Sequence, residues 1–207
     1  MCWNAEVSLN TFIYAIISFF IVLIFNKIQI INVFLALSIS LMQLYEYFVW
    51  KNIHNEKIIY YLSIFGPSLI LLQLLLIAYG NLKNKTELII TISLIFIVGI
   101  ICMIYNYFNN KFDMKVGENG HLIWYWADVP PLLLVIIFIC YLYPMIQYNN
   151  IFIFTFTSIL LLISLYYYYK YKTWGTMWCY FSNLIWIFLL GKSIYLYIID
   201  NNNNNNN

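Results

Sequence analysis

The chain has 207 residues, of which 64% are hydrophobic and only 9% are charged, and its ten lysines against eight acids give a formal net charge of +2. A soluble domain carries roughly 25% charged residues, so this composition indicates a protein whose solvent is lipid. The chain has no arginine and no basic cluster, which excludes a nucleic-acid-binding protein because phosphate backbones are neutralised by clustered Lys and Arg.

Seven apolar stretches are each long enough to cross a bilayer, which takes about 20 residues at 1.5 Å of helical rise. Their hydrophobicity is continuous rather than alternating, and this favours helices over a barrel. We therefore predict an all-α, polytopic integral membrane protein in which residues 1–199 form one bundle of seven transmembrane helices. The predicted spans are 7–25, 28–50, 58–80, 88–108, 122–146, 150–169 and 174–199. The asparagine-rich residues 200–207 predict a disordered tail.

The distribution of lysines between the loops predicts the orientation. Seven spans place the two termini on opposite sides of the membrane. Loops on the N-terminal side carry six lysines, whereas the other side carries three, or four when Lys192 is included. Cytoplasmic loops are enriched in Lys and Arg, so we expect the N-terminus to be cytoplasmic.

Polar and aromatic side chains gather at the end of the predicted bundle where the N-terminus lies. Gln43, Glu46 and Trp50 share one face of the second span because they are spaced i, i+3, i+7. The stretch 121–128 opens the fifth span with the same spacings, provided that it is helical, and a third polar stripe begins the seventh span. The candidate ligand-binding pocket is therefore Glu6, Gln43, Glu46, Trp50, His121, Trp124, Asp128, Trp178, Ser182 and Asn183. Its tryptophans either wall this pocket or form an interfacial aromatic belt.

The acids are the most informative members of this set. Glu46 lies inside a span, where a charge costs about 2.5–3.5 kcal/mol, so it either faces a functional interior or reaches interfacial water. Asp128 precedes Val129-Pro130-Pro131. Because Pro130 disfavours helical geometry at Val129, Asp128 either caps the following helix or belongs to the pocket. The prolines also predict a break, with residues 121–129 at the interface or re-entering it.

No metal and no cofactor is predicted. Two histidines are too few for a three-histidine zinc site, and His54 has no ligand-like spacing. A retinal Schiff base at Lys192 would need an acid in the third span, and residues 58–80 contain none. Cys2 is either buried for structural reasons, acylated, or a nucleophile.

Three short segments together carry a resemblance. They are the opening Met1-Cys2-Trp3-Asn4-Ala5-Glu6-Val7-Ser8, the run Gln43-x-x-Glu46-x-x-x-Trp50, and the stretch from Trp178-Cys179 to Ser182-Asn183. The chain resembles an uncharacterised family of multi-pass membrane proteins from large DNA viruses and unicellular eukaryotes. The resemblance implies a host or viral membrane as its location, and it implies no activity.

Three functions stay open at this point. The leading interpretation is a membrane protein that binds or transports a small molecule, lipid or ion at the polar pocket, with Glu46 carrying charge or a proton. The second is an intramembrane lipid-modifying hydrolase that uses Glu46, Asp128 and His121 as acid and base groups. The third is a non-catalytic protein that organises a membrane. The predicted partners are the lipid bilayer and one such ligand, without nucleic acid.

Overall fold

The computed structural model of the chain describes residues 4–147 and 151–205. The elements follow in the order α1 (Ala5–Phe25), α2 (Ile30–Lys51), α3 (Glu56–Asn81), α4 (Lys85–Phe108), β1 (Met114–Val116), β2 (Leu122–Trp124), the 3₁₀ helix η1 (Tyr125–Ala127), α5 (Pro131–Gln147), α6 (Ile151–Tyr168), α7 (Trp174–Ser182) and α8 (Ile185–Asn205). Met1 to Trp3, and with them the expectations for Cys2, lie outside the described residues.

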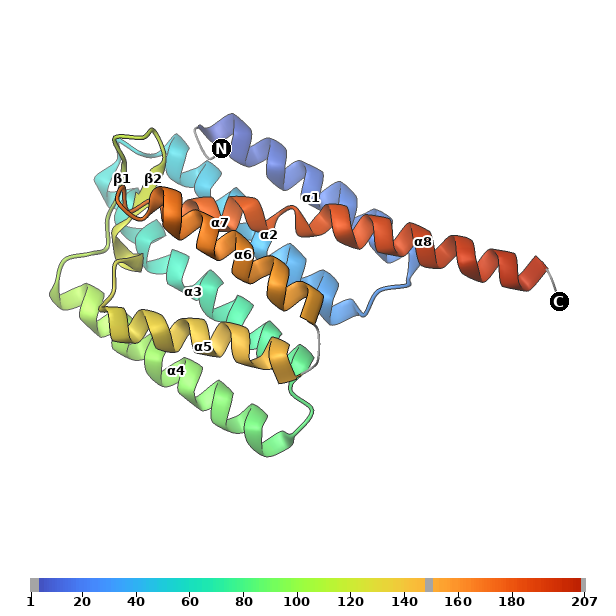
Figure 1. Cartoon of the computed structure of the whole chain (residues 1–207). Coiled ribbons are helices and arrows are strands. Elements are labelled where there is room, and N and C mark those ends of the chain that lie inside the picture. The colour runs from blue at the N-terminus through green and yellow to red at the C-terminus, as the bar shows by residue number, and fades with distance from the viewer. Residues whose placement is uncertain (1–3, 148–150, 206–207) are drawn as a thin grey trace.

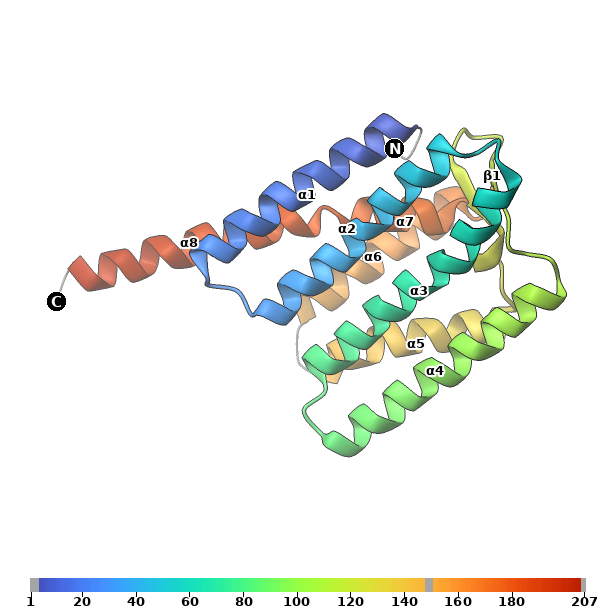
Figure 2. The same cartoon turned by 180° about the vertical axis from the view of Figure 1, so that it is seen from behind.

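Successive helices run back and forth along one direction, so their ends gather at two opposite ends of the stack (Figures 1 and 2). The antiparallel hairpin β1–β2, in which Met114 pairs with Trp124 and Val116 with Leu122, lies over one of these ends. We call this the hairpin end. It also holds the start of α1, α3, α5 and α7 (Figure 1). The C-terminal half of α8 projects beyond the rest of the stack at the opposite end (Figure 1).

Within residues 4–147 and 151–205, five helical runs are long and apolar enough to cross a membrane, namely α1 to α4 and the run Trp174–Asp200 that contains α7 and most of α8. Helices α5 and α6 are shorter apolar helices. Large apolar side chains face outward on these helices, as with Ile24 at 80% exposed and Leu132 at 71%, while Gln43 and Glu46 are fully buried. A water-soluble surface does not carry this much contiguous apolar area. The arrangement is compatible with an integral membrane protein.

Asparagines mark where several helices begin and end. Asn4, Asn55 and Asn84 each precede a helix and accept a hydrogen bond on the side-chain oxygen from a first-turn backbone N–H. Asn26 ends α1 in the left-handed conformation, at φ 48°, a geometry that asparagine tolerates better than most residues. These caps satisfy backbone groups at both helix ends, which explains why the asparagines lie between the apolar runs.

The interior consists of three apolar clusters. One joins α2 and α3 to α5, α6 and α7 around Ile77 and Tyr141. A second fills the hairpin end, where Met42 and Tyr45 of α2 pack against Trp124 and Trp126. The third holds α1 against α2 and α8. The hairpin is thus packed into the helical stack, and β2 and η1 supply part of its interior.

The predicted fifth span, 122–146, is not one helix. Residues 122–124 form strand β2, 125–127 form η1, and the helix α5 occupies only Pro131–Gln147. The break predicted at Pro130 is present, because proline lacks the N–H that a continuing helix needs and restricts the residue before it. The supposition that His121, Trp124 and Asp128 share a helix face is therefore wrong.

The predicted seventh span, 174–199, is divided into α7 and α8 by a tight turn at Asn183 and Leu184. Hydrogen bonds of the i to i−3 kind, such as Leu184 N to Phe181 O at 3.0 Å, replace the α-helical pattern there. Helix α8 continues to Asn205, into the tract for which the sequence predicted disorder, and residues 206 and 207 lie outside the described residues.

Candidate functional site

Nine of the ten predicted pocket residues lie on or next to α2, β2, η1 and α7, and α7 contacts both α2 and β2. They are Gln43, Glu46 and Trp50 of α2, His121 and Trp124 at β2, Asp128 after η1, Trp178 and Ser182 of α7, and Asn183 just after α7. The tenth residue, Glu6, is an exposed side chain in the first turn of α1. The structure therefore leaves Glu6 away from any enclosed space that the other nine form.

Glu46 and Gln43 are enclosed between α2 and α7. Both side chains are fully buried, and Glu46 is close enough to the thiol of Cys179 on α7 to interact with it electrostatically. Trp50, one further turn along α2, is half-buried. Its indole N–H is enclosed and has no hydrogen-bond partner among the described residues. The predicted polar stripe of α2 therefore faces the bundle interior and not the membrane surface.

Ser182 and Asn183 fall at the α7–α8 turn. Ser182 Oγ donates to the carbonyl of Trp178, 2.8 Å away, within its own helix. Asn183 Oδ1 accepts a hydrogen bond of 2.8 Å from Ser40 of α2, and Ser40 Oγ accepts one of 2.7 Å from Trp186 Nε1. All of these groups are buried. This network links α2 to the break in the last span.

The hairpin brings two buried tryptophans and a histidine to this end. The rings of Trp124 and Trp126 stack with centroids 5.0 Å apart and planes 14° apart. His121 is buried and presents its ring edge-on to Tyr168, with centroids 5.5 Å apart. Gly66 of α3 lies directly beneath these rings, because a Cβ at that position would meet Trp126 Cζ2 at 2.7 Å. The glycine therefore makes room for the stacked pair.

A cavity of about 340 Å³ lies between α3, α4, α5 and α7, and Trp124, Trp126 and Trp178 form part of its wall. We call it the large cavity. Its walls are almost wholly apolar. They include three cysteines that form no disulfide, Cys102, Cys140 and Cys179. Its volume falls within the range of small-molecule sites, about 300–1,000 Å³. The cavity can hold an apolar ligand of moderate size.

The few polar atoms on the walls of the large cavity have unused hydrogen-bonding capacity. Asn106 of α4 is 1% exposed, and its Nδ2 donates to the carbonyl of Trp126 at 2.8 Å. Within the described part of the chain, Asn106 Oδ1 and the indole N–H groups of Trp124 and Trp178 have no hydrogen-bond partner. A buried polar group without a partner costs about 1–3 kcal/mol.

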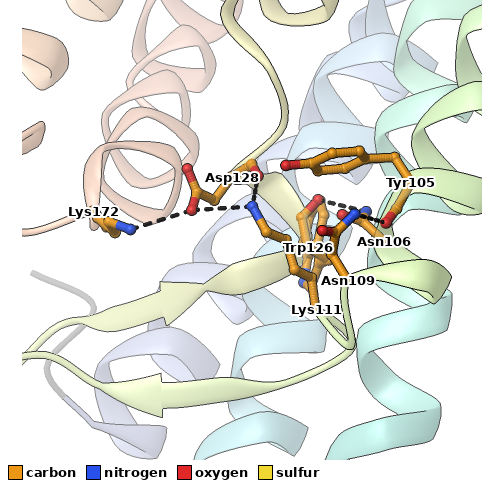
Figure 3. A network of polar contacts seen from close by, with 7 residues as sticks. All are labelled: Tyr105, Asn106, Asn109, Lys111, Trp126, Asp128 and Lys172. Carbon is orange, nitrogen blue, oxygen red and sulfur yellow. Dashed lines mark hydrogen bonds and ion pairs between the residues drawn. The ribbon is translucent and has the colours of Figure 1, made fainter.

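Asp128 lies outside the large cavity and ties two loops together. Figure 3 shows Lys111 and Lys172 reaching its carboxylate from opposite sides, and each Nζ lies 3.2 Å from Asp128 Oδ2. Lys111 Nζ also donates to the backbone carbonyl of Asp128 and lies 5.0 Å from the ring centre of Tyr105. Partial burial alone would raise the pKa of Asp128, but the hydrogen bonds and charges of the two lysines outweigh it and lower that pKa.

A second cavity, of about 190 Å³, lies beside this ion-pair network and is more polar. We call it the small cavity. Asp128, Lys170, Lys172 and the first turn of α7 line it. It shares four lining residues with the large cavity, namely Trp124, Ala127, Trp174 and Gly175. The two cavities therefore adjoin across a common wall.

The predicted pocket residues divide among these features. Trp124 and Trp178 line the large cavity, Trp124 and Asp128 line the small one, and the remaining seven line neither. Sequence reasoning missed Asn106, Ser40 and the lysine partners of Asp128. A signal for the first two was present, since an amide and a hydroxyl inside apolar spans need internal partners. Nothing local in the sequence connects Asp128 with lysines at positions 111 and 172.

Among the residues that the structure describes, no three His, Cys, Asp or Glu side chains group closely enough to hold a metal ion. No protein-family model, curated protein or solved structure matches this chain.

Proposed function

We propose that the protein is a seven-pass integral membrane protein that admits the hydrocarbon chain of a bilayer lipid into the large cavity. The observation that carries this proposal is the rim of the cavity on α4. Phe96, Ile100 and Ile104 line the cavity, yet each is 45–58% exposed on the outer surface of the bundle. They are four residues apart and so form one stripe along the helix. A cavity bordered by such a stripe opens sideways, toward lipid.

The length of the cavity matches one leaflet. On α4 it extends from Asn106, near the hairpin end, to Ile95, near the middle of the helix. Eleven residues of helix rise about 16 Å, and half of a hydrocarbon core is about 15 Å. A chain entering from the leaflet at the hairpin end would therefore lie parallel to its bilayer neighbours while it occupies the cavity.

Energetics favour a lipid chain as the occupant. An empty apolar cavity loses dispersion contacts along its whole lining, and a lipid chain restores them. Moving that chain from bilayer to protein yields no hydrophobic free energy, because lipid tails are already as apolar as the cavity wall. Packing therefore fills the cavity.

The alternating helix directions support seven passes, in which α5 and α6 are the shorter ones. Six lysines belong to loops and helix ends at the hairpin end, namely Lys51, Lys57, Lys111, Lys115, Lys170 and Lys172. The opposite end has Lys27, Lys83 and Lys85, with Lys192 within α8. By the positive-inside rule the hairpin end is cytoplasmic, and the large cavity opens to the cytoplasmic leaflet.

Binding or transfer of lipid is favoured over lipid hydrolysis. The hydrolase alternative needs Glu46, Asp128 and His121 around one reacting bond. Of these three residues only Asp128 lines either cavity, and its carboxylate is engaged by two lysines. The apolar lining of the large cavity offers no pair of acid and base groups.

The test is photo-crosslinking in vesicles with a phosphatidylcholine that carries a diazirine on its acyl chain. Ile95 and Cys140 are buried residues of the cavity wall, so labelling there reports a chain inside the cavity. Outward-facing Ile17 of α1 reports the surrounding lipid. We expect labels at all three positions. Labelling confined to outward-facing residues would overturn the proposal.

A matched pair of glycine variants adds the control. Gly99 lines the large cavity, and a Cβ there meets only Leu71 Cδ1, at 3.4 Å. Gly191 on α8 has no atom within 4 Å of its Cβ position. Gly99→Leu fills cavity space and should suppress labelling at Ile95 and Cys140. Gly191→Leu makes the same chemical change elsewhere and should leave the labelling pattern unchanged.

A further inference from the structure

We propose that the small cavity binds the phosphate group of an anionic membrane lipid whose hydrocarbon chain occupies the large cavity. This inference rests on the proposed function of the large cavity and names the class of lipid that it selects. It draws on three features of the hairpin end, namely the wall shared by the cavities, the local charge and the start of α7.

The shared wall places a polar compartment directly next to an apolar one. Trp124, Ala127, Trp174 and Gly175 line both cavities. Gly175 keeps this wall thin, because a Cβ there would stand 3.2 Å from Trp124 Cε3. The small cavity lies at the α6–α7 loop beside Tyr169, where tyrosine and lysine suit the headgroup level of a bilayer. A polar compartment at headgroup level above an apolar compartment one leaflet deep has the shape of a lipid.

The charge at the small cavity is positive. Lys170 and Lys172 line it together with Asp128, and Lys111 pairs with the same carboxylate. Three lysines against one acid leave a local surplus of two positive charges. Lys170 is exposed and forms no ion pair with any residue of the described ranges. Its ammonium group is available to an anion, and a phosphate group carries one to two negative charges.

Helix α7 begins at this cavity without a side-chain cap. Trp174, Gly175 and Thr176 form its first turn and line the small cavity. Thr173 at the N-cap makes no capping hydrogen bond with its side chain, and its Oγ1 instead accepts one of 2.8 Å from Asn119 Nδ2. The first N–H groups of a helix lack intrahelical partners and carry a partial positive charge, so they favour a phosphate oxygen.

The junction of the two cavities suits the middle of a lipid molecule. Trp124 belongs to the shared wall and faces Gly175 through the Cε3–Cζ3 edge of its indole. A glycerolipid carries ester carbonyl groups between its phosphate and its chains, and these groups would lie at this junction.

The experiment measures lipid binding to the full chain in detergent by native mass spectrometry. The probes are phosphatidic acid and phosphatidylcholine with identical oleoyl chains. We expect tighter binding of phosphatidic acid to the wild type. Lys170→Gln combined with Lys172→Gln should weaken phosphatidic acid binding roughly 30-fold, about fivefold for each lysine, and leave phosphatidylcholine binding unchanged. Lys83→Gln combined with Lys85→Gln removes the same charge at the opposite end and should change neither affinity.

The outcomes separate the two proposals. Equal binding of both lipids to the wild type, or an unchanged preference in the Lys170 and Lys172 variant, would overturn the headgroup site. Chain labelling at Ile95 and Cys140 would still uphold the large cavity in that case. Failure of that labelling would instead refute the proposed function. Displacement of phosphatidic acid by excess inorganic phosphate alone would show a site for free phosphate, and would overturn the lipid as its source.

If the double variant at Lys170 and Lys172 misfolds, a single variant still tests whether the small cavity binds phosphate. Lys170→Gln by itself removes a cation that no residue of the described ranges pairs with, so it should preserve the Asp128 network. We expect about a fivefold weaker binding of phosphatidic acid to this single variant. No change in that affinity would count against the inference.

Discussion

Ser40 of α2 donates a hydrogen bond of 2.8 Å to Oδ1 of Asn183, across 143 positions of sequence, at the point where the last span breaks. The same hydroxyl oxygen accepts from Trp186 Nε1 at 2.7 Å. One small side chain therefore satisfies a polar group in the α7–α8 turn and another in the first turn of α8, within a part of the bundle that excludes water. The turn stays folded because its polar groups have these partners.

We predict that Ser40→Ala destabilises the protein by about 1–2 kcal/mol, because it leaves two buried polar groups without their partner. Thermal unfolding in detergent measures the change. Ser38→Ala is the control, since Ser38 Oγ donates only to Leu35 O within its own helix. A loss for Ser38→Ala as large as that for Ser40→Ala would contradict the assignment.

Gly66 sets how closely α3 approaches the stacked tryptophans. A Cβ at this position would stand 2.6 Å from the hydroxyl of Tyr45 and 2.7 Å from Trp126 Cζ2. Gly66→Ala should therefore cost about 1–3 kcal/mol through overpacking, although alanine is the better helix former. Gly191→Ala meets no atom within 4 Å and should be neutral or stabilise by up to about 1 kcal/mol. Gly66→Ala should lower the melting temperature and Gly191→Ala should not, and a stabilised Gly66→Ala variant would refute the packing.

The Asp128 network predicts a dependence of stability on pH. The two lysines lower the pKa of the Asp128 carboxyl in the folded protein. The ionised carboxylate therefore contributes fully to the free energy of unfolding above about pH 3.9, the pKa of Asp in the unfolded chain. That contribution is lost as the pH falls through the lowered pKa. The Asp128→Asn variant lacks this ion-pair contribution to the free energy of unfolding at every pH. The side chain is 42% exposed, so we expect a loss of at most about 1 kcal/mol near neutrality.

Thermal unfolding of wild type and Asp128→Asn against pH measures this contribution. The gap between them should be constant above about pH 5 and should shrink below about pH 4. Glu118→Gln is the control, because the exposed Glu118 side chain forms no ion pair with the described residues. A gap that widens in acid would reverse the expected sign and exclude this linkage.

A variant at Glu46 tests which of two sites binds the ligand: the polar pocket that the sequence predicted, or the apolar large cavity proposed above. Glu46→Gln keeps the shape of this buried side chain and removes its charge. Glu46 lines neither cavity, so we expect the variant to fold and to show wild-type acyl-chain labelling at Ile95 and Cys140. Glu87→Gln, in the first turn of α4, is the matched control. Loss of labelling in the Glu46 variant alone would favour the polar pocket.

Topology has its own test. Cysteines introduced at Glu118 in the hairpin and Asn202 near the end of α8 lie at exposed positions. In a background with the native cysteines replaced, a membrane-impermeant maleimide should label position 118 from the cytoplasmic side and position 202 from the other. Labelling of both positions from one side would refute an odd number of passes.

Some of the site was foreseeable from local sequence and some was not. Pro130 predicted the break before α5, because a proline restricts its own backbone and that of the preceding residue. The pairing of Met114 with Trp124 had no such signal, since strands three residues long carry little periodicity. Asn106 stood inside a predicted span as a visible amide, but only the fold shows that it borders a cavity and donates to Trp126.

The sequence by itself determined that the chain has helices long and apolar enough to cross a membrane. It also determined the positions of the first four helices, whose bounds lie within about three residues of the predicted spans. Apolar length and asparagine caps are local properties, and lipid leaves helices as the way to satisfy the backbone. Only the tertiary structure decided which side chains meet. Asp128 contacts lysines at positions 111 and 172, which lie in different segments of the chain. The walls of both cavities also combine segments far apart in the sequence. Their proximity depends on helix packing that no local pattern encodes.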